Sequence, residues 1–598
     1  MPTDKTSGRY SFSIFEVNAA SGELFRQGVR IKLQEQPFRL LVLLLERAGE
    51  VVSRDELRGQ LWPQDTFVEF DNSLNVAVRK LREALRDDAE TPRFVETLPR
   101  RGFRFLAPVT SSASQSAEPV EAVRPNLPTS AARRPAIVVL PFANLSSDPD
   151  REFFADGITE EIINALTQIG NLRVVARTSA FSFKGKQIDL RTIGASLNVT
   201  TVLEGSVRKS GNRVRIVAQL IDAADGYHIW AERYDRELQD IFEVQDEIAR
   251  TIAEKLKVTL GVEINEPLVR TGTTDMEAYQ LYLKGRFHSN KRSADGLRKS
   301  IEYLQQAIQK DSNYALAYAG LSDAFNMIAF RNVLSPDAIM PKAKAASARA
   351  LELDPHRAEP YISLGYAAFT YDRDWLAADR YFGQGLAVNP LCVTGHPFYP
   401  LYLSALGRHD ESISIARRAL ERDPVSPIVS HMLAVQLYLA RQFDQAVRQS
   451  HQTLEMDASY GPALEVLGQI FSLTGLHRDA IVELERSLAA TQHSAWARAL
   501  LGYAHARAGD RKRTQEIIDE LAEAAKSTFV PATCFALTYT GLVDAGLAEP
   551  DQAFAWLEAA WKERHGRLAY LRAEALWDPI RSDPRFEQLS QRAGSPFV

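Results

Sequence analysis

The stretch DNSLNVAVRKLREALRDDAETPRFVETLPRRGFRFLAP, Asp71 to Pro108, decides how the N-terminal part of the chain folds. Its first half predicts a helix, because Asp71, Asn72 or Ser73 can accept an orphan backbone N–H at the helix start, and no Pro or Gly follows before Pro92. Apolar side chains recur along it at helical spacing, namely Leu74, Val78, Leu81 and Leu85. We therefore expect an amphipathic helix with one buried stripe.

A second stripe of this helix is polar and cationic, and it consists of Asn75, Arg79, Arg82 and Arg86. After the helix, FVETL and GFRFL alternate like strands around the turn PRRG, residues 99–102. A run of charge is by itself usually the solvated face of a helix. Here a turn with two guanidinium groups follows the charged helix, so the pattern favours nucleic-acid binding.

The composition limits what else the chain can be. With 598 residues, 45% hydrophobic and 25% charged, it is expected to hold several globular domains. The formal net charge of -5 excludes a generally polycationic surface, so any nucleic-acid binding must come from a local patch. Cys392 and Cys534 are too few for a disulfide framework or a multi-cysteine metal site. No signal sequence or membrane-spanning run is present, so we expect a cytoplasmic protein without a membrane contact.

The residues before the opening stretch complete one domain. Residues 9–33 alternate as short strands and predict a small antiparallel sheet. From Gln36 an apolar-rich helix runs to about Gly49. Ser53 and Glu56 then match a capping box that opens a second helix, SRDELRGQLW. Three helices between a sheet and a hairpin predict a winged helix.

Residues 9–108 resemble the OmpR/PhoB-type winged helix-turn-helix of bacterial response regulators. The resemblance is carried by LLVLLLERAGEVVSRDELRGQLW, SLNVAVRKLREALRD and FVETLPRRGFRF. It implies that the third helix enters the major groove of DNA and that the wing touches the minor groove or the backbone. The residues that it implies at DNA are Asn75, Arg79, Lys80, Arg82, Arg86, Arg100, Arg101 and Arg104. Arg79 is the favoured base reader, and Lys80, Arg82 and Arg101 are expected to hold phosphates.

The winged helix begins near residue 9, so we expect neither the receiver domain of the phosphorelay family nor aspartyl phosphorylation within this chain. Residues 109–135 are rich in Ser, Ala and Pro and predict a flexible linker. Membrane-anchored regulators of the CadC-like type carry a transmembrane helix after the winged helix. This chain has no such run there, so we expect a version without one.

Residues 136–263 change to a pattern of apolar strands and amphipathic helices, which predicts an α/β domain. VVLPFANLSSDPDREFFADGITEEI and VLEGSVRKSGNRVRIVAQLIDAADGYHIWAERYDR resemble a TolB-like or FlgO-like domain, which implies no defined activity. An acid–base or phosphate site can be imagined from Asp156, Glu160, Glu161, Arg173, Arg177 and Lys184. No phosphate loop, nucleophile elbow or metalloprotease motif supports it, and carboxylates in a first helical turn are favoured by the helix dipole.

Residues 273–568 are periodic and helical. Turns at Asp354, Asn389, Asp423 and Asp457 lie 35, 34 and 34 residues apart, the period of tetratricopeptide repeats. Small residues recur where such helices pack closely, at Gly365, Ala434, Gly468 and Gly502. Pro400 replaces one of them, so we expect that helix to bend or to start late. Residues 569–598 are expected to form capping helices, with Trp577 and Phe586 covering apolar surface.

We therefore expect a multidomain α+β and all-α fold: a winged helix, an α/β TolB-like domain and a tetratricopeptide α-solenoid. A solenoid groove suits a protein or peptide partner, although the array could instead only space or dimerise the molecule. The expected function is bacterial transcription regulation by binding double-stranded DNA, as a homodimer on DNA, with a C-terminal sensory region. No enzyme activity, cofactor or metal is expected. The alternative is an interaction scaffold whose winged helix binds protein rather than DNA.

Overall fold

The structure is a computed structural model of the chain, and it falls into two units, Met1–Ser130 and Ala131–Val598. Each unit is described by itself. The residues that the structure describes are 9–12, 15–19, 21–26, 29–31, 33–61, 70–85, 87, 92, 94–98, 101–107, 109–112, 135–146, 152–167, 169, 172–186, 188–255, 272–491 and 494–594.

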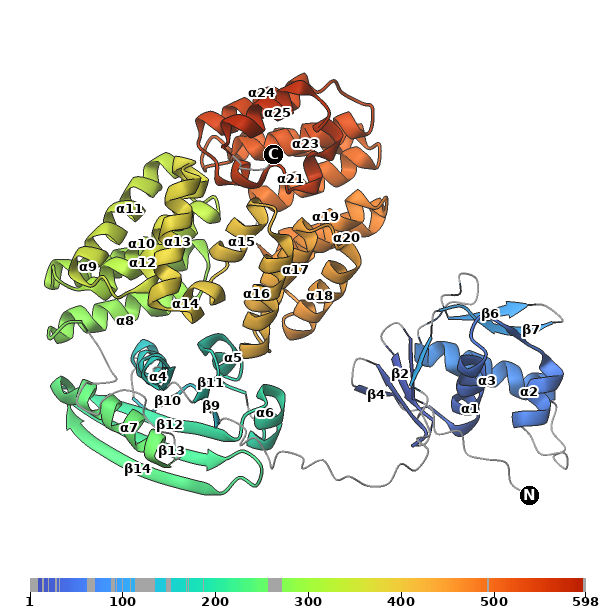
Figure 1. The fold of residues 1–598 in the computed structure, drawn as a ribbon, viewed down its shortest axis with the longest axis horizontal. Coiled ribbons are helices and arrows are strands. Elements are labelled where there is room, and N and C mark those ends of the chain that lie inside the picture. Colours follow the sequence, from blue (N-terminus) through green and yellow to red (C-terminus); the bar gives the residue numbers. More distant parts are fainter. Residues whose placement is uncertain are drawn as a thin grey trace, which may run out of the picture. The chain divides into compact units, whose positions relative to one another are not determined.

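An antiparallel sheet opens the first unit, as the alternating residues 9–33 predicted (Figure 1). Its strand order is β4-β3-β2-β1-β8. The strands are β1 (Arg9–Phe12), β2 (Phe15–Asn18), β3 (Glu23–Arg26), β4 (Val29–Ile31) and β8 (Thr110–Ser112). The linker was expected from residue 109, but residues 110–112 pair with β1 instead. This strand could not be predicted from the sequence, because three residues of the sequence Thr-Ser-Ser show no alternation of apolar and polar side chains.

Three helices and a second sheet complete the winged helix. The helices are α1 (Glu35–Glu46), α2 (Arg54–Leu61) and α3 (Phe70–Leu85). The predicted capping box is present: Ser53 N–H donates to Glu56 Oε2 at 2.9 Å, and Glu56 N–H donates to Ser53 Oγ at 3.3 Å. The wing sheet has the order β5-β7-β6, from β5 (Val51–Val52), β6 (Val95–Leu98) and β7 (Gly102–Phe105).

Aromatic rings join the first sheet to the wing. Phe12 packs edge-on against Phe105 at 4.8 Å between ring centroids, and Phe94 lies 5.6 Å from both Phe12 and Phe15. The predicted stripe of α3 completes this core, since Leu74, Val78, Leu81 and Leu85 are all buried. The burial of these side chains fixes which face of α3 remains for a partner.

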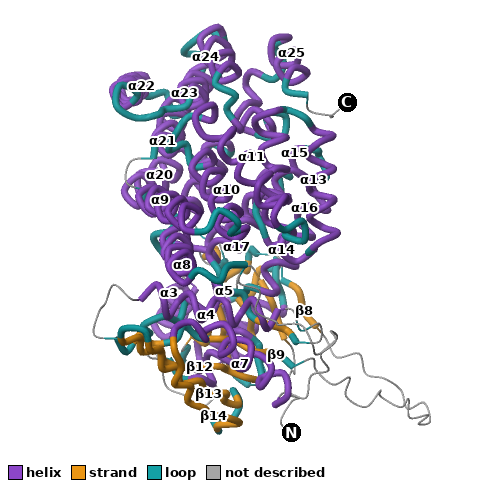
Figure 2. Tube along the Cα trace, turned by 90° about the vertical axis from the view of Figure 1, so that its left-hand side faces the viewer, coloured by secondary structure: helices purple, strands orange, loops and turns teal. Residues whose placement is uncertain are grey.

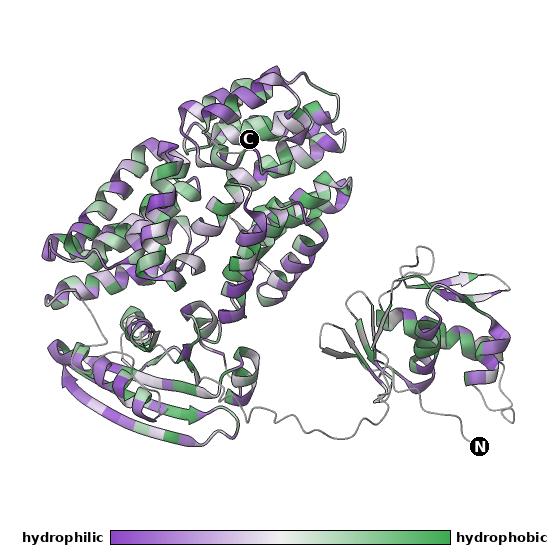
Figure 3. Cartoon of the chain, in the orientation of Figure 1, coloured by the Kyte–Doolittle hydropathy of each residue, from purple (hydrophilic) through white to green (hydrophobic). Residues whose placement is uncertain are grey.

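The second unit begins with a mixed six-stranded sheet, of order β11-β9-β12-β13-β14 with β10 beside β12. The strands are β9 (Ala136–Val139), β10 (Ala143–Asn144), β11 (Arg173–Val174), β12 (Thr201–Ser210), β13 (Arg213–Asp222) and β14 (His228–Glu237). β12, β13 and β14 form the predicted meander, and they lie side by side in Figure 2. The edge strand β14 is largely hydrophilic (Figure 3).

Helices pack against this sheet and connect it to the array that follows. They are α4 (Glu152–Thr167), α5 (Arg177–Phe181), α6 (Leu190–Leu197), the 3-10 turn η2 (Leu238–Asp240) and α7 (Ile241–Lys255). α4 contacts α7, and it also contacts α8, the first helix of the array. α5 was not predicted, because five residues are too short to show a helical period.

The rest of the second unit is a tetratricopeptide-like array of helices. Its elements are α8 (Met276–Asn290), α9 (Ala294–Lys310), α10 (Ala315–Phe330), α11 (Pro336–Leu353), α12 (Ala358–Ala367), the π-helical turn η3 (Ala368–Asp372), α13 (Trp375–Val388), α14 (Pro390–Gly395), α15 (Phe398–Ala405), α16 (His409–Arg422), α17 (Pro427–Leu439), α18 (Phe443–Met456), α19 (Gly461–Leu473), α20 (His477–Ala490), α21 (Ala495–Arg507), α22 (Arg511–Ala524), α23 (Ala532–Asp544) and α24 (Asp551–Lys562). Consecutive helices pack as pairs, joined by short loops.

The residues that recur with the repeat period end the helices or allow the paired helices to pack closely. Asp354, Asn389, Asp423 and Asp457 are the C-cap residues of α11, α13, α16 and α18. A Cβ added to Gly468 would lie 2.4 Å from the Leu484 side chain, so a larger residue would push α19 and α20 apart. The helix with Pro400 begins late, at Phe398, after the separate short helix α14.

The chain closes with short helices that pack on the array: η4 (Gly566–Tyr570), η5 (Ala575–Ile580) and α25 (Pro584–Arg592). Trp577 and Phe586 are buried there, as predicted. This segment also returns to the middle of the array, since Trp375 Nε1 donates to the carbonyl of Ala593 at 3.0 Å. Arg441 Nη2 on the α17–α18 loop likewise donates to Asp578 at 2.7 Å. The C-terminal segment therefore covers part of α12 to α17.

Candidate nucleic-acid interface

α3 presents a narrow polar face opposite its buried stripe. Asn75 and Arg79 are exposed one helical turn apart, on the face that the sequence assigned to DNA. Val76, beside Asn75, keeps 41% of its surface exposed although it is apolar. An exposed apolar side chain next to Asn and Arg suits contact with the methyl group of thymine. The sequence analysis missed Val76 because this residue belongs neither to the apolar stripe nor to the cationic stripe of the helix. Its position next to Asn75 could have indicated it.

Arg82 is placed differently from Arg79. Its Nη2 atom donates to the carbonyl of Val95 at 2.6 Å and to Thr97 Oγ1 at 2.8 Å, both on β6. Asp87 also connects the end of α3 to β6, because its carboxylate accepts a hydrogen bond from the backbone N–H of Val95 at 2.8 Å. The guanidinium that was expected to hold a phosphate thus fastens the end of α3 to the wing.

Lys80 and Arg104 also have partners inside the first unit. Lys80 Nζ donates to Oε1 of Gln34, the N-cap residue of α1, at 2.6 Å. Arg104 forms an ion pair with Glu96 across the β6–β7 hairpin, at 2.6 Å, and it is half-buried. Both side chains stabilise the packing of the domain, and each would have to exchange a partner to reach DNA.

The wing turn exposes Arg101 at the tip of the hairpin, where its backbone N–H donates to the carbonyl of Leu98 at 3.0 Å. Gly102 follows with a φ of +140°, and a Cβ there would lie 2.0 Å from the carbonyl oxygen of Val52. Only glycine lets the hairpin approach β5 this closely. Arg86 and Arg100, also expected at DNA, lie outside the described residues.

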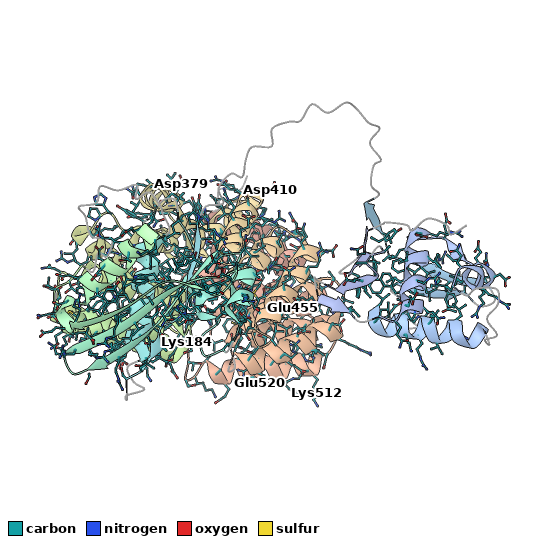
Figure 4. The ribbon with its side chains drawn as sticks, turned by 90° about the horizontal axis from the view of Figure 1, so that it is seen from below. Lys184, Asp379, Asp410, Glu455, Lys512 and Glu520 are labelled. Carbon is teal, nitrogen blue, oxygen red and sulfur yellow. The ribbon has the colours of Figure 1, made fainter. Side chains whose placement is uncertain are left out.

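A second group of charged residues lies where α4 meets α5 and α8. Glu160 forms ion pairs with Arg177, at 2.9 Å, and with Arg286 of α8. Lys184, labelled in Figure 4, donates to Asp156 at 2.6 and 2.7 Å. Burial alone would raise the pKa of Glu160, but Arg286 and Arg177 outweigh it and hold that pKa at about 2. These carboxylates and cations neutralise one another, which suits a packed junction.

Of the remaining members of the predicted acid–base set, Glu161 lies near Glu160, whereas Arg173 has partners in another element. Arg173 donates to the carbonyl of Leu197 at 2.9 Å, away from the carboxylates. Burial, reinforced by Glu160, raises the pKa of Glu161 to about 7. Among the described residues, no group of three or more His, Cys, Asp or Glu side chains could hold a metal ion. Over the same residues, no helix is long and apolar enough to cross a membrane.

Comparison with known proteins places the first unit in a family. Residues 28–105 match the family described as "Transcriptional regulatory protein, C terminal". The transcriptional regulator HilA of Salmonella typhimurium is 23% identical over 492 residues, which are 81% of this chain and 83% of HilA. Putative adenylate cyclase 3 of Rhizobium meliloti is 46% identical over 198 residues, so the match spans only 33% of that relative.

A solved structure also aligns with part of the chain. The DNA-binding domain of E. coli CadC aligns with 27% identity and a TM-score of 0.16, over 17% of this chain and 94% of that domain.

Proposed function

Because residues 28–105 form a domain of the C-terminal family of transcriptional regulatory proteins, we propose that the chain is a transcription regulator that binds double-stranded DNA through α3 and the wing. The exposed face of α3 carries this proposal: the side chains of Asn75, Val76 and Arg79 are accessible, while Leu74, Val78, Leu81 and Leu85 are buried. Amide, methyl-contacting and guanidinium groups are the side-chain types that read base edges in the major groove.

We assign different roles to the basic residues of this surface. Arg79 is the proposed base reader, and Arg101 the proposed phosphate contact at the wing. Arg82 acts as a positioning residue, because its bonds to β6 set the angle between α3 and the wing. Lys80 and Arg104 contribute positive charge beside the interface while they stabilise the domain.

The full-length protein should bind a labelled duplex at low salt, and its affinity should fall steeply as salt rises. Arg79→Ala should weaken binding to a preferred site by about 1–3 kcal/mol, the usual value of one Arg–guanine contact. Arg101→Ala should weaken binding equally for all sequences and reduce the salt slope by about 1. Arg418→Ala, an exposed arginine of α16, is the matched control. Absence of binding at about 50 mM salt would favour the scaffold alternative, in which the winged helix binds protein.

For the second unit we propose a sensory role that controls occupancy of DNA, in a cytoplasmic regulator that pairs as a homodimer on DNA. The support is the order of the parts: a DNA-binding domain precedes a large region that resembles a TolB-like domain followed by tetratricopeptide-like helices. The sequence predicted the boundaries 9–108, 109–135, 136–263, 273–568 and 569–598. We propose to extend the first domain to residue 112, so that it includes β8, and to keep the later boundaries. A protein or peptide partner would bind the part of the array that the C-terminal segment leaves uncovered.

We propose that the chain is not an enzyme, although one relative is named a putative adenylate cyclase. That match spans a third of the relative, and two carboxylates of α4 are neutralised by ion pairs, Glu160 with Arg177 and Asp156 with Lys184. Incubation of the full-length protein with ATP and a divalent cation, followed by chromatography, tests this view. Formation of cyclic AMP would contradict it.

A further inference from the structure

The short helix α5 belongs to the sheet-containing part of the second unit, β9 to β14 with α4 to α7, which we call the α/β part. It is bonded to the turn between α16 and α17 of the array (Figure 1). Ser179 N–H donates to Asp423 Oδ1 at 2.9 Å, and the Thr178 hydroxyl donates to Asp423 Oδ2. In return, the backbone N–H of Val425 donates to Ser179 Oγ at 3.2 Å. Ser179 and Asp423 are both buried, so these three bonds are shielded from water.

Asp423 supplies the N-terminal cap that α5 lacks in its own sequence. The N-cap residue of α5 is Ala176, whose side chain has no oxygen to accept an orphan backbone N–H. Ser179 is the third residue of the helix, where a cap normally binds the N–H, and Asp423 accepts this N–H. A helix of five residues is not stable alone in water. The helical form of α5 therefore depends on its contacts with the rest of the second unit, among them Asp423.

The corresponding turns of other repeats show a different arrangement. Asp423 is the C-cap residue of α16, and three residues hold the same position in α11, α13 and α18, namely Asp354, Asn389 and Asp457. In each of these three turns the side-chain oxygen accepts the backbone N–H two residues later, at 3.1, 3.1 and 3.0 Å. In the α16–α17 turn the N–H two residues later is that of Val425, and it is bonded to Ser179 instead.

Ser179 thus replaces a hydrogen bond that the array would otherwise make within its own turn. Its N–H takes the place of the Val425 N–H at the carboxylate, and its hydroxyl takes the place of the carboxylate at Val425. When α5 leaves, Asp423 and Val425 can bond to each other as their counterparts do in the other turns, so neither becomes a buried group without a partner. Ser179 and Thr178 then bond to water. Because both arrangements satisfy these groups, α5 has the properties of an element with two states.

A second contact keeps the α/β part on the array when α5 is released. Glu160 of α4 forms an ion pair with Arg286 of α8, and it accepts a hydrogen bond from Asn290 of α8 at 3.3 Å. Arg177, the first residue of α5, joins this group through its ion pair with Glu160 at 2.9 Å. α5 therefore connects the contact at α8 to the contact at the α16–α17 turn, which lies in the middle of the array.

We propose that α5 is a conformational latch between the α/β part and the array. In the closed state, Asp423 caps α5, and the α/β part is attached both to α8 and to the α16–α17 turn. In the open state, α5 is released and loses its helical form, Asp423 bonds to Val425, and the α/β part stays attached through Glu160 and Arg286. The use of this latch to pass a signal toward DNA rests on the proposed regulatory function, whereas the existence of the two states does not.

The test is hydrogen exchange of the full-length protein without DNA, measured residue by residue by mass spectrometry. In the wild type, the amides of residues 180–184 should exchange faster than those of β12 and α17, because α5 opens without unfolding of the parts that it joins. Exchange as slow as that of β12 would overturn the proposal. Ser179→Ala removes the acceptor of the Val425 N–H and should speed the exchange of residues 180–184 by about tenfold, since one bond of the closed state is lost. Unchanged exchange of these residues would also overturn it.

The amide of Val425 distinguishes a latch from a fixed contact. In Ser179→Ala it should stay protected, because Asp423 accepts it in the open state, and it should lose protection only when Asp423→Ala is added. Loss of its protection in Ser179→Ala alone, with no further change in the double variant, would show a fixed contact and overturn the proposal.

Thr178→Val is a milder second variant, which removes only the hydroxyl bond to Asp423. It should speed the exchange of residues 180–184 and leave Val425 protected, so the single variants decide the question even where the double variant does not fold. Thermal unfolding checks that each variant keeps its fold. Ser459→Ala is the matched control, because its hydroxyl donates to Asp457 at 2.7 Å in the α18–α19 turn, and it should leave α5 unchanged. Because no DNA is present, each outcome is independent of the DNA-binding proposal.

Discussion

The two units use arginine in opposite ways. On α3 the side chain of Arg79 is exposed, whereas at the junction of α4 and α8 the side chains of Arg177 and Arg286 are half-buried beside Glu160. The first arrangement leaves a guanidinium accessible to an external anion. The second satisfies it inside the protein. What differs is therefore the exposure of the guanidinium group, and this exposure decides whether an arginine can reach an external ligand.

Arg82 lies between these two cases. It occupies the same polar stripe as Arg79, yet its guanidinium reaches back to two acceptors on β6. A helical stripe therefore describes the direction in which a side chain leaves the helix and says little about where its end arrives. The contrast between buried and exposed arginines can be tested by removing members of each kind.

The largest effect is expected from Glu160→Ala at the paired junction. The substitution removes a buried carboxylate and leaves the half-buried guanidinium groups of Arg177 and Arg286 without it, so the second unit should lose about 3–5 kcal/mol of unfolding free energy. Denaturant unfolding followed by tryptophan fluorescence reports it, because six of the seven tryptophans lie in that unit. Glu302→Ala, an exposed acid of α9, is the control and should change stability by less than about 0.5 kcal/mol. Equal effects of the two substitutions would show that the junction is not a buried ion-pair network.

An intermediate effect is expected from Arg82→Ala. Loss of its bonds to Val95 and Thr97 should reduce the stability of the first unit by about 1.5–3 kcal/mol, the range for hydrogen bonds to charged groups. Hydrogen exchange of α3 and β6 amides measures this loss. Arg79→Ala should leave the same amides unchanged while it weakens DNA binding. If both variants lose DNA affinity with intact amide protection, Arg82 is a direct contact after all.

The smallest effect is a pH dependence from Glu161. Its pKa is raised to about 7 by burial, so the folded protein holds this proton more tightly than the unfolded chain does. Stability from this group is therefore complete below the unfolded pKa, near 4.5, and is lost as the pH rises through about 7. Between pH 6 and 8 the loss should be about 1 kcal/mol, measured as a fall in the denaturation midpoint.

Glu161→Gln keeps the shape of the side chain and removes this titration. The variant should show a shallower decline in stability above pH 6 than the wild type, with Glu465 as the other acid titrating near pH 7. If stability declined with pH equally in the variant and the wild type, Glu161 would not be the buried acid that titrates near pH 7.

Several parts of the fold were predictable because they rest on local periodicity. The capping box of Ser53 and Glu56, the buried stripe of α3 and the repeat of helix C-caps near every 34 residues all appear as expected. Each is set by residues within about one or two helical turns or one repeat of each other. Short elements such as β5, β8 and α5 were missed, because two to five residues carry no measurable period.

The candidate interface was predictable only in part. Helical spacing placed Asn75 and Arg79 on one exposed face, as the structure shows. The partners of Lys80, Arg82 and Arg104 lie 46, 13 and 8 residues away along the chain, in other elements. Spacing within one helix or hairpin turn contains no information about such partners, so the sequence assigned all of these cations to DNA alike.

By itself, the sequence determined the winged helix, the repeat array and the local stripe of positive charge, since each follows from short-range hydrophobic period and turn chemistry. Tertiary structure alone decided which guanidinium groups are used internally and which remain available. It also joined the C-terminal segment to the loop after α10, through a hydrogen bond between His565 and Asn332, which lie 233 positions apart. The physical reason is that a charge is stabilised by atoms close in space, whatever their distance along the chain.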